Sequence, residues 1–419
     1  MRNWLAMSAV AFAAACGLTE PYAVAETKGP VTDDLGVVEV PKGAPIVIGG
    51  YWVISGADTS LGVDSKRGAE IAFDDMGNMI AGHPIQFQVE DDTCNAEGGQ
   101  TAGTKLSTVP NIVGVLGPAC SSAATTAAPI LWKQGIVDVG TATTAPSLTA
   151  ADRKPDYFGY LRTIYSDADQ GKNDAEYFYN QLKCTTLATI HDGSPYASQL
   201  AKVAANHFKE LGGQVVAEEA ISPTDVDMHP VLTSIATKKP CALYFPIFVA
   251  AGAQIIRQVP EVAGLKGTQI FGGSSMASPD LIQAAGDAIK GFRFTNVDIS
   301  PAALGKTYPA FVDKYTKKYG EGPTNSFHAH AYDAAIILGK AIEAVAKTDD
   351  KTGTTYIGRK ALRDALYATK GYDGISGPIN CDANGECGAF NFAVYEYTSS
   401  DASKFKLGDN PKKIYPAAK

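Results

Sequence analysis

Short apolar runs rich in β-branched residues alternate with amphipathic helical stretches along most of the chain after residue 45. One such stretch is 65–80, in which Ala69, Ala72, Phe73 and Met76 fall on one helical face. Strands that alternate with helices predict parallel sheets covered by helices on both sides. The expected strands lie in IVIGGYWV, PIQFQVEDD, IVGVLGP, GIVDVGT, TTLATIHD, QVVAEEAI, CALYFPIF, TQIFGG and FRFTNV.

These units are too numerous for one ordinary sheet, and 419 residues are more than one compact core usually holds. We therefore expect an α/β fold with two doubly wound parallel-sheet lobes. Residues 26–44 look like a leader arm ahead of the first lobe. Near the end of the chain, 375–397 predicts antiparallel strands rather than another strand–helix unit.

The first 25 residues predict a secretory signal peptide that is not part of the fold. Residues 5–18 are apolar but too short to span a bilayer comfortably, and the AVA of 23–25 forms a small-x-small cleavage site. The alternative is lipoprotein processing at Cys16, because AAAC loosely matches a lipobox. The mature chain is thus expected to be exported to the periplasm, either free or with a lipid anchor at Cys16.

Six cysteines remain once Cys16 is set aside, and an even number in an oxidising compartment suggests three disulfides. The pairs favoured by position are Cys381–Cys387 across a hairpin-like turn, Cys184–Cys241 at the starts of two strand-like runs that could be neighbours, and, by elimination, Cys94–Cys120. The alternative is that these cysteines are free and buried.

Charge and motif content argue against several function classes. The net charge of −8 is unlike that of a nucleic-acid binder, which normally carries a basic face. The sequence contains neither HExxH nor GxSxG, and nothing in it pairs a nucleophile with a base, so we expect no catalytic residue and no cofactor. His328 and His330 are spaced i, i+2, which would place them on different helix faces and argues against a metal site.

Two loops that follow neighbouring strand-like runs are rich in hydroxyl groups. Residues 119–122 (ACSS) follow IVGVLGP and open a helix, and 141–149 (TATTAPSLT) follow GIVDVG. Ligands of open parallel sheets bind beyond the carboxyl ends of the strands, where such loops gather. Ser121 could cap the helix, and the helix N-terminus together with the Thr144 hydroxyl would favour a carboxylate. The alternative is a plain serine N-cap beside a polar turn.

Several segments together resemble a known family. DDTC at 91–94, GPACSS at 117–122, TAPSLT at 144–149, LRTIYSDADQG at 161–171, IHDGSPYASQL at 190–200, AQIIRQV at 253–259 and ISGPINCDANGE at 375–386 occur in one order. This ordered set resembles the periplasmic binding proteins of the branched-chain amino acid ABC-importer family, the leucine/isoleucine/valine-binding type.

The resemblance implies a clamshell of two lobes joined by three crossovers. Lobe one would comprise 45–164 and 296–376, and lobe two 165–295 and 377–415. It also implies a disulfide between Cys94 and Cys120. Carried onto this sequence, the family's carboxylate donors are Ser121, Thr144 and the backbone of Ala142, its apolar walls are Ala119, Cys120, Thr143 and Phe327, and its second-lobe tyrosine is Tyr196.

The sequence departs from the family pattern at three of the implied ligand-binding positions. Phe248 and Leu61 stand where tyrosines would be more usual, and Ser274 stands where the family holds the ligand's ammonium with a glutamate. A buried ammonium without a carboxylate partner would be costly. Either another acid takes that role, or the ligand lacks an α-ammonium.

The resemblance implies a non-enzymatic solute receptor that is expected to be a monomer and to bind no nucleic acid. Its partners would be a small carboxylate-bearing solute, such as a branched-chain or related amino acid, and the membrane permease subunits of an ABC importer. The alternative ligand is an aromatic acid, an amide or another non-amino-acid carboxylate. Less favoured classes are a sensory ligand-binding module and a periplasmic enzyme.

Overall fold

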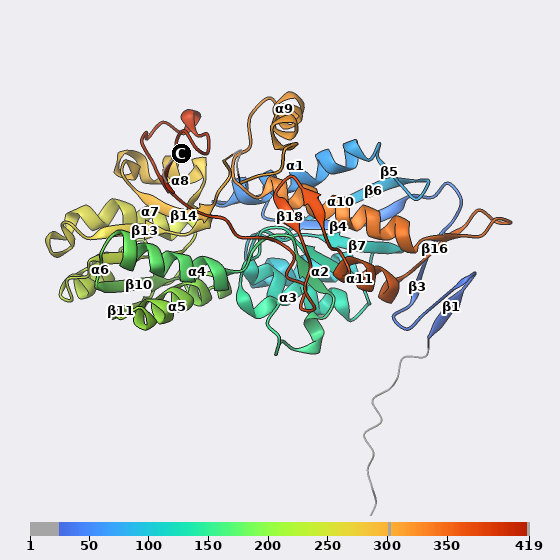
Figure 1. The fold of residues 1–419 in the computed structure, drawn as a ribbon, viewed down its shortest axis with the longest axis horizontal. Helices are drawn as coiled ribbons and strands as arrows, with labels where there is room; N and C mark the ends of the chain where they lie inside the picture. Colours follow the sequence, from blue (N-terminus) through green and yellow to red (C-terminus); the bar gives the residue numbers. More distant parts are fainter. Residues whose placement is uncertain (1–24, 301–302, 417–419) are drawn as a thin grey trace, which may run out of the picture.

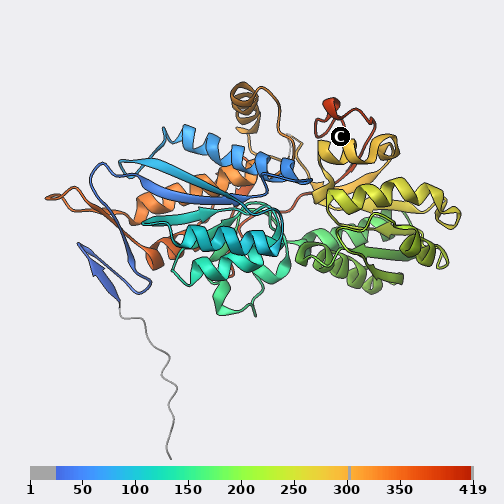
Figure 2. The same cartoon turned by 180° about the vertical axis from the view of Figure 1, so that it is seen from behind.

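A computed structural model describes residues 25–300 and 303–416 of the chain. The predicted signal peptide, with Cys16, lies outside the described residues apart from Ala25. Two α/β lobes lie side by side, each built around its own mainly parallel sheet (Figures 1 and 2). The predicted fold class is therefore confirmed.

The sheet of the first lobe has six strands, of which only the short edge strand β5 is antiparallel to its neighbour. All seven residues of its central strand β4 are buried, as a near-continuous apolar run predicts for a strand covered on both faces. In order across the sheet, the strands are β5 (Met79–Ile80), β6 (His83–Asp91), β4 (Ile46–Trp52), β7 (Ile112–Leu116), β8 (Val137–Gly140) and β9 (Tyr160–Arg162).

The sheet of the second lobe has seven strands, with five parallel strands followed by two antiparallel ones. Of the antiparallel pair at its edge, β19 lies within 375–397, where antiparallel strands were expected, and β20 lies beyond that range. In order across the sheet, the strands are β11 (Gln214–Ala220), β10 (Thr186–His191), β12 (Ala242–Tyr244), β13 (Gln269–Gly272), β14 (Arg293–Val297), β19 (Phe392–Glu396) and β20 (Lys412–Tyr415).

Helices cover both faces of each sheet. In the first lobe, α1 (Thr59–Asp75) packs with α10 (His328–Val345) on one face, and α2 (Ala96–Ser107) packs with α3 (Ser121–Trp132) on the other (Figure 1). The remaining helices are α4 (Asp167–Glu176), α5 (Pro195–Glu210), α6 (His229–Ala236), α7 (Val249–Gln258) and α8 (Pro279–Ala285) in the second lobe, and α9 (Tyr308–Tyr319) and α11 (Arg359–Tyr367) in the first.

The chain passes between the lobes three times, as the resemblance implied. The passages lie between β9 and α4, between β14 and α9, and between β18 (Gly377–Ile379) and β19. Strand β18 pairs with β17 (Tyr372–Gly374) beside the first lobe. The lobe limits given above, at 164, 296 and 376, stay a proposal, and β14 extends through 296 and 297 as part of the second sheet.

Two local differences from the sequence expectation have identifiable causes. The helix predicted over 65–80 ends at Asp75, because Gly77 and Asn78 adopt positive φ angles of 67° and 54°, and Met79 and Ile80 then form β5. Strand β9 was not expected. It is only three residues long.

The segment 26–44, expected as a leader arm, contains three short strands. Strand β1 (Glu26–Lys28) pairs with β2 (Val31–Asp33). Strand β3 (Val37–Val40) pairs with β16 (Thr355–Gly358), which also pairs with β15 (Lys347–Thr348). The segment is thus joined by hydrogen bonds to a part of the chain more than 300 residues away.

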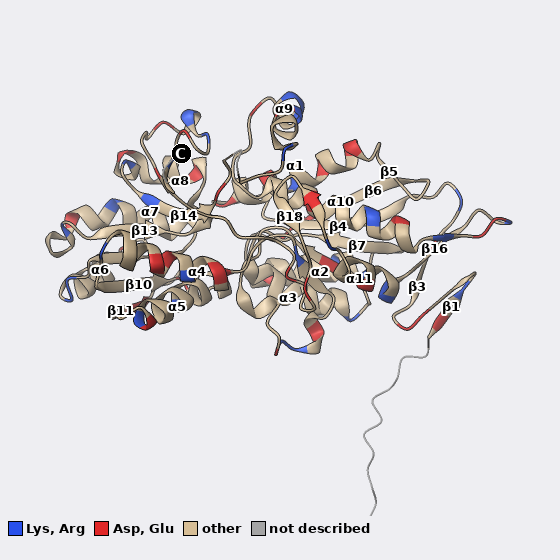
Figure 3. Cartoon of the chain, viewed as in Figure 1, with Lys and Arg blue, Asp and Glu red and all other residues tan. Residues whose placement is uncertain are grey.

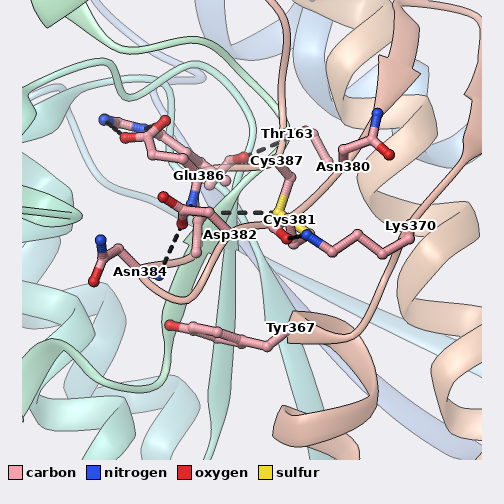
Figure 4. Close-up of a disulfide and its surroundings, with 12 residues drawn as sticks. Thr163, Tyr367, Lys370, Asn380, Cys381, Asp382, Asn384, Glu386 and Cys387 are labelled. Atoms are coloured by element: carbon pink, nitrogen blue, oxygen red, sulfur yellow. Dashed lines mark hydrogen bonds and ion pairs between the residues drawn. A yellow bond between two sulfur atoms is a disulfide. The ribbon is translucent and has the colours of Figure 1, made fainter.

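The structure contains the three disulfides favoured by position: Cys94–Cys120, Cys184–Cys241 and Cys381–Cys387. Cys184 and Cys241 meet because β10 and β12, which they precede, are adjacent parallel strands with Leu187 opposite Ala242. Cys94 lies in the loop after β6 and fastens that loop to the start of α3. The Cys381–Cys387 bridge closes the turn that carries Glu386 (Figure 4).

Acidic and basic residues are interspersed along both lobes rather than gathered on one of them (Figure 3). Among the helices that the structure describes, none combines the length and apolar character needed to cross a membrane.

Candidate functional site

A small cavity, with room for little more than a water molecule, lies between the two lobes. The residues that line it come from both lobes, and none of them carries a charge. The first lobe contributes Leu61, Ala119, Ser121, Ala142, Thr144 and Phe327, and the second contributes Tyr196, Phe248, Ser274 and Ser275.

The first-lobe side of the cavity contains the N-terminus of α3. Cys120 is the N-cap residue and makes no side-chain cap, and Ser121 is the first residue of the helix. The expectation that Ser121 caps the helix is therefore wrong: its hydroxyl oxygen accepts a hydrogen bond from the Ala145 amide at 3.2 Å instead. Within the described residues, the amides of Ser121 and Ser122 have no acceptor. Free amides at a helix N-terminus favour an anion.

The loop that contains Ala142 and Thr144 is held in place by hydrogen bonds from a buried arginine. Arg162 donates from Nη1 to the carbonyl oxygens of Thr143 at 3.0 Å and Ala145 at 2.9 Å. Its Nη2 donates to the Thr149 hydroxyl at 2.7 Å, and its Nε donates to Glu386 at 3.1 Å. This arrangement holds the Thr144 backbone between two anchored carbonyl groups and so positions its side chain at the cavity.

The second-lobe side of the cavity is aromatic and hydroxyl-rich. Tyr196 lies in the first turn of α5, and its ring centroid is 5.4 Å from that of Phe248, which precedes α7. The Ser275 hydroxyl lies 3.2 Å from the Tyr196 hydroxyl and donates to the Ile247 carbonyl at 2.7 Å. Ser274 Oγ lies 3.5 Å from the same tyrosine hydroxyl. These contacts give this wall an apolar surface with a polar edge.

Nine of the predicted ligand-contacting residues line the cavity, and two do not. Cys120 has its sulfur in the disulfide, and the Thr143 hydroxyl contacts the Tyr160 hydroxyl within the first lobe. Ser275 was not predicted. Ser274 and Ser275 both lie in a short 3₁₀ turn, and both line the cavity. The sequence of this segment does not indicate that the second serine reaches the cavity as well.

His328 and His330 have separate structural partners. His328 Nδ1 lies 2.8 Å from a carboxylate oxygen of Asp64, and its Nε2 lies 2.8 Å from the Tyr308 hydroxyl. His330 Nδ1 lies 3.1 Å from the Thr163 carbonyl, and burial lowers its pKa to about 4. Each ring is thus engaged in its own buried contacts.

The lobes touch through hydrogen bonds around the cavity. Asp58 accepts from the Val249 amide at 3.1 Å, and the Ser60 hydroxyl lies 2.9 Å from that of Ser278. Elsewhere, the Ser147 amide donates to the Gln199 side chain at 3.0 Å. These contacts join the first lobe to the second, so the structure is a closed form of the protein.

Asp58 is expected to make closure sensitive to pH. Burial raises the pKa of Asp58 to about 6, opposed by the Val249 amide and assisted by the Asp280 and Asp192 carboxylates. In an open form the carboxyl would be exposed, with an ordinary pKa of about 3.9. The closed form therefore holds the proton more tightly, and its stability rises as the pH falls through 6.

The test is the affinity of the wild type for its solute relative to that of Asp58→Asn, which resembles the protonated side chain at every pH. We expect this ratio to rise about four-fold between pH 7.5 and pH 5.5. Isothermal titration calorimetry of both proteins measures it, and all other titrating groups cancel in the ratio. A ratio that does not change with pH would show that Asp58 plays no part in closure.

The chain is similar to known proteins over most of its length. A family model described as "Periplasmic binding protein" matches residues 45–402. A Leu/Ile/Val-binding protein of Escherichia coli (strain K12) is 28% identical over 358 residues, which cover 83% of this chain and 91% of that protein. The crystal structure of a leucine-binding protein from Thermotoga maritima is 25% identical with a TM-score of 0.75, over 85% of this chain and 96% of that one.

A more distant structure has the same fold. It is a solute-binding protein from R. palustris in complex with benzoate, which is 22% identical with a TM-score of 0.70 and covers 87% of this chain and 94% of that one.

Proposed function

The chain belongs to the type I periplasmic binding proteins of the branched-chain amino acid family, and we propose that it is the receptor that delivers a small carboxylate-bearing solute to an ABC importer. The solute is a branched-chain or related amino acid, and it binds in the cavity between the lobes. The protein is exported to the periplasm, acts as a monomer and delivers its solute to membrane permease subunits. It carries out no reaction on the solute.

One observation carries this proposal: the cavity places a free helix N-terminus opposite an aromatic wall. The α3 amides and the Thr144 hydroxyl suit a carboxylate, and the Tyr196 and Phe248 rings suit an apolar side chain. In this closed form the cavity has room for little more than a water molecule. The lobes would part to admit and hold a solute of amino-acid size.

Closure follows from contacts that need both lobes. In an open form the first lobe would take the carboxylate at Ser121 and Thr144. The second lobe would then rotate about the three passages of the chain and bring Tyr196 and Phe248 over the solute. Because the solute contacts both lobes only in the closed form, it shifts the population toward closure. The permease subunits would recognise the closed form.

The experiment is a thermal-shift panel of amino acids and simple carboxylic acids. At a concentration one hundred times its Kd, a ligand stabilises the protein by about 2.7 kcal/mol, which raises Tm by roughly 3 °C for a chain of this length. We expect leucine, isoleucine or valine to give this shift. A shift with benzoate-like acids but with no amino acid would favour the alternative ligand class. No shift with any acid would contradict the proposed function.

A further inference from the structure

We propose that Asp167 binds the ammonium group of the solute, so that the protein selects zwitterionic amino acids over simple carboxylates. This inference rests on the proposed function, since it requires the solute to lie in the cavity between the lobes. Asp167 is not one of the residues that line the cavity, and the ligand class that it would select is the amino acids.

Asp167 lies where the first passage between the lobes enters α4. It is the first residue of that helix, after the N-cap Ser166, and it is fully buried. Its amide donates to the carbonyl oxygen of Thr144 at 2.8 Å. The backbone of Asp167 is therefore joined directly to a residue that lines the cavity.

Both carboxylate oxygens of Asp167 lack a hydrogen-bond partner among the described residues. An unpartnered buried carboxylate is costly, and buried charges are normally paired. Arg162, whose charge acts on Asp167, does not form an ion pair with it. The five N–H groups of that arginine are taken by the Thr143 and Ala145 carbonyls, the Thr149 hydroxyl and two contacts to Glu386.

The Asp167 carboxyl interacts electrostatically with cavity residues of both lobes. Burial raises the pKa of Asp167 to about 7, and the nearby Thr144 hydroxyl and Arg162 oppose that rise. Burial, and after it the charge of Asp167, raises the pKa of the Tyr196 hydroxyl. Asp167 thus interacts with Thr144 of the first lobe and with Tyr196 of the second, and both of these residues line the cavity.

A second unpartnered polar atom lies in the same region. The buried Tyr165 hydroxyl forms no hydrogen bond among the described residues, although the Ser274 hydroxyl is near enough to lower its pKa against the larger effect of burial. A primary ammonium has three N–H donors. The Asp167 carboxylate together with the Tyr165 or Tyr196 hydroxyl oxygen would satisfy them. No acidic side chain would then be needed at the position of Ser274 to bind the ammonium group.

The test compares amino acids with the same molecules lacking the amine. The pairs are L-leucine and 4-methylpentanoate, L-valine and 3-methylbutanoate, and L-phenylalanine and 3-phenylpropanoate. We expect the wild type to bind at least one amino acid at least ten-fold more tightly than its partner acid, and Asp167→Asn to lose about thirty-fold in affinity for that amino acid with little change for the acid. Calorimetric titration measures each affinity.

Asp174→Asn is the matched control. Asp174 lies on the same helix, is equally buried, and accepts a hydrogen bond from Tyr244 within the second lobe. We expect this variant to leave the preference for the amine unchanged. Equal losses in the two variants, or an unchanged preference in Asp167→Asn, would overturn the role of Asp167.

The pH dependence of the wild type gives a second readout that needs no variant. An amino acid requires the ionised carboxylate, whereas its partner acid does not. The preference for the amine should therefore fall about ten-fold between pH 8 and pH 6, given a pKa of about 7 for Asp167 in the absence of ligand. The charges of Arg162 and Glu386 act on the Asp167 carboxyl, and burial raises the pKa of Asp174 on the same helix to about 8. The Asp174→Asn variant removes that second titration and should keep the pH dependence of the preference.

The outcomes separate the two proposals. A wild type that binds the simple acids as tightly as the amino acids, or a preference that does not vary with pH, overturns the role of Asp167 and leaves the carboxylate receptor standing. Binding of none of the six compounds contradicts the proposed function and, with it, the inference.

Discussion

The double substitution Ser121→Ala and Thr144→Val is expected to weaken solute binding at least one hundred-fold. Both side chains line the cavity on the side of the α3 N-terminus. A hydrogen bond to a charged group contributes about 1.5–3 kcal/mol, so the loss of two such bonds costs about 3–5 kcal/mol. The α3 amides remain in the variant, and they should keep some affinity for the carboxylate. Isothermal titration calorimetry with the best-stabilising acid measures the loss.

Ser122→Ala with Thr125→Val is the matched control. These residues lie on the same helix, and the Thr125 hydroxyl donates to the Ser122 carbonyl at 2.8 Å rather than facing the cavity. This variant should bind within about two-fold of the wild type. If the cavity variant bound equally well, the carboxylate would not lie at the α3 N-terminus.

The substitution Glu386→Ala is expected to destabilise the protein by about 3 kcal/mol. It leaves the fully buried Arg162 without its only anionic partner among the described residues, and breaking a buried ion pair in this way typically costs about 3–5 kcal/mol. The Glu386 side chain is 27% exposed, which places the expectation at the low end of that range. Urea unfolding followed by circular dichroism measures the free energy of unfolding.

Glu218→Ala provides the comparison, because it breaks an ion pair with Lys209 in which both side chains are 48% exposed. An exposed pair of this kind contributes at most about 1 kcal/mol. Equal effects of the two substitutions would show that Glu386 is not needed to neutralise Arg162. Because Arg162 anchors the Thr143 and Ala145 carbonyls, we also expect Glu386→Ala to weaken solute binding.

The alternation of strands and helices was enough to predict the architecture. Apolar runs such as 46–52 are strands buried on both faces, and that property is visible in the residues themselves. Strand β9 was not predicted, because three residues are too few to show a strand pattern in the sequence. The end of α1 was set by backbone conformation at Gly77 and Asn78, which the helical periodicity of the flanking residues did not reveal.

The hydroxyl-rich loops indicated the first-lobe side of the site, because helix N-termini and strand ends follow from local sequence. The second-lobe residues Tyr196, Phe248 and Ser274 came from the family resemblance, since nothing local marks them. The isolation of Asp167 could not be predicted from sequence. It depends on Glu386, more than 200 residues away, which satisfies Arg162 and leaves Asp167 without a partner.

A crystal structure of the protein with the acid that raises its Tm most tests the central claim directly. The solute should lie between the lobes, with its carboxylate within hydrogen-bond distance of the Ser121 amide and the Thr144 hydroxyl, and with Tyr196 and Phe248 covering its side chain. A solute bound on one lobe alone, or in the wider groove between α9 and residues 402–407, with the cavity between the lobes left empty, would contradict the account.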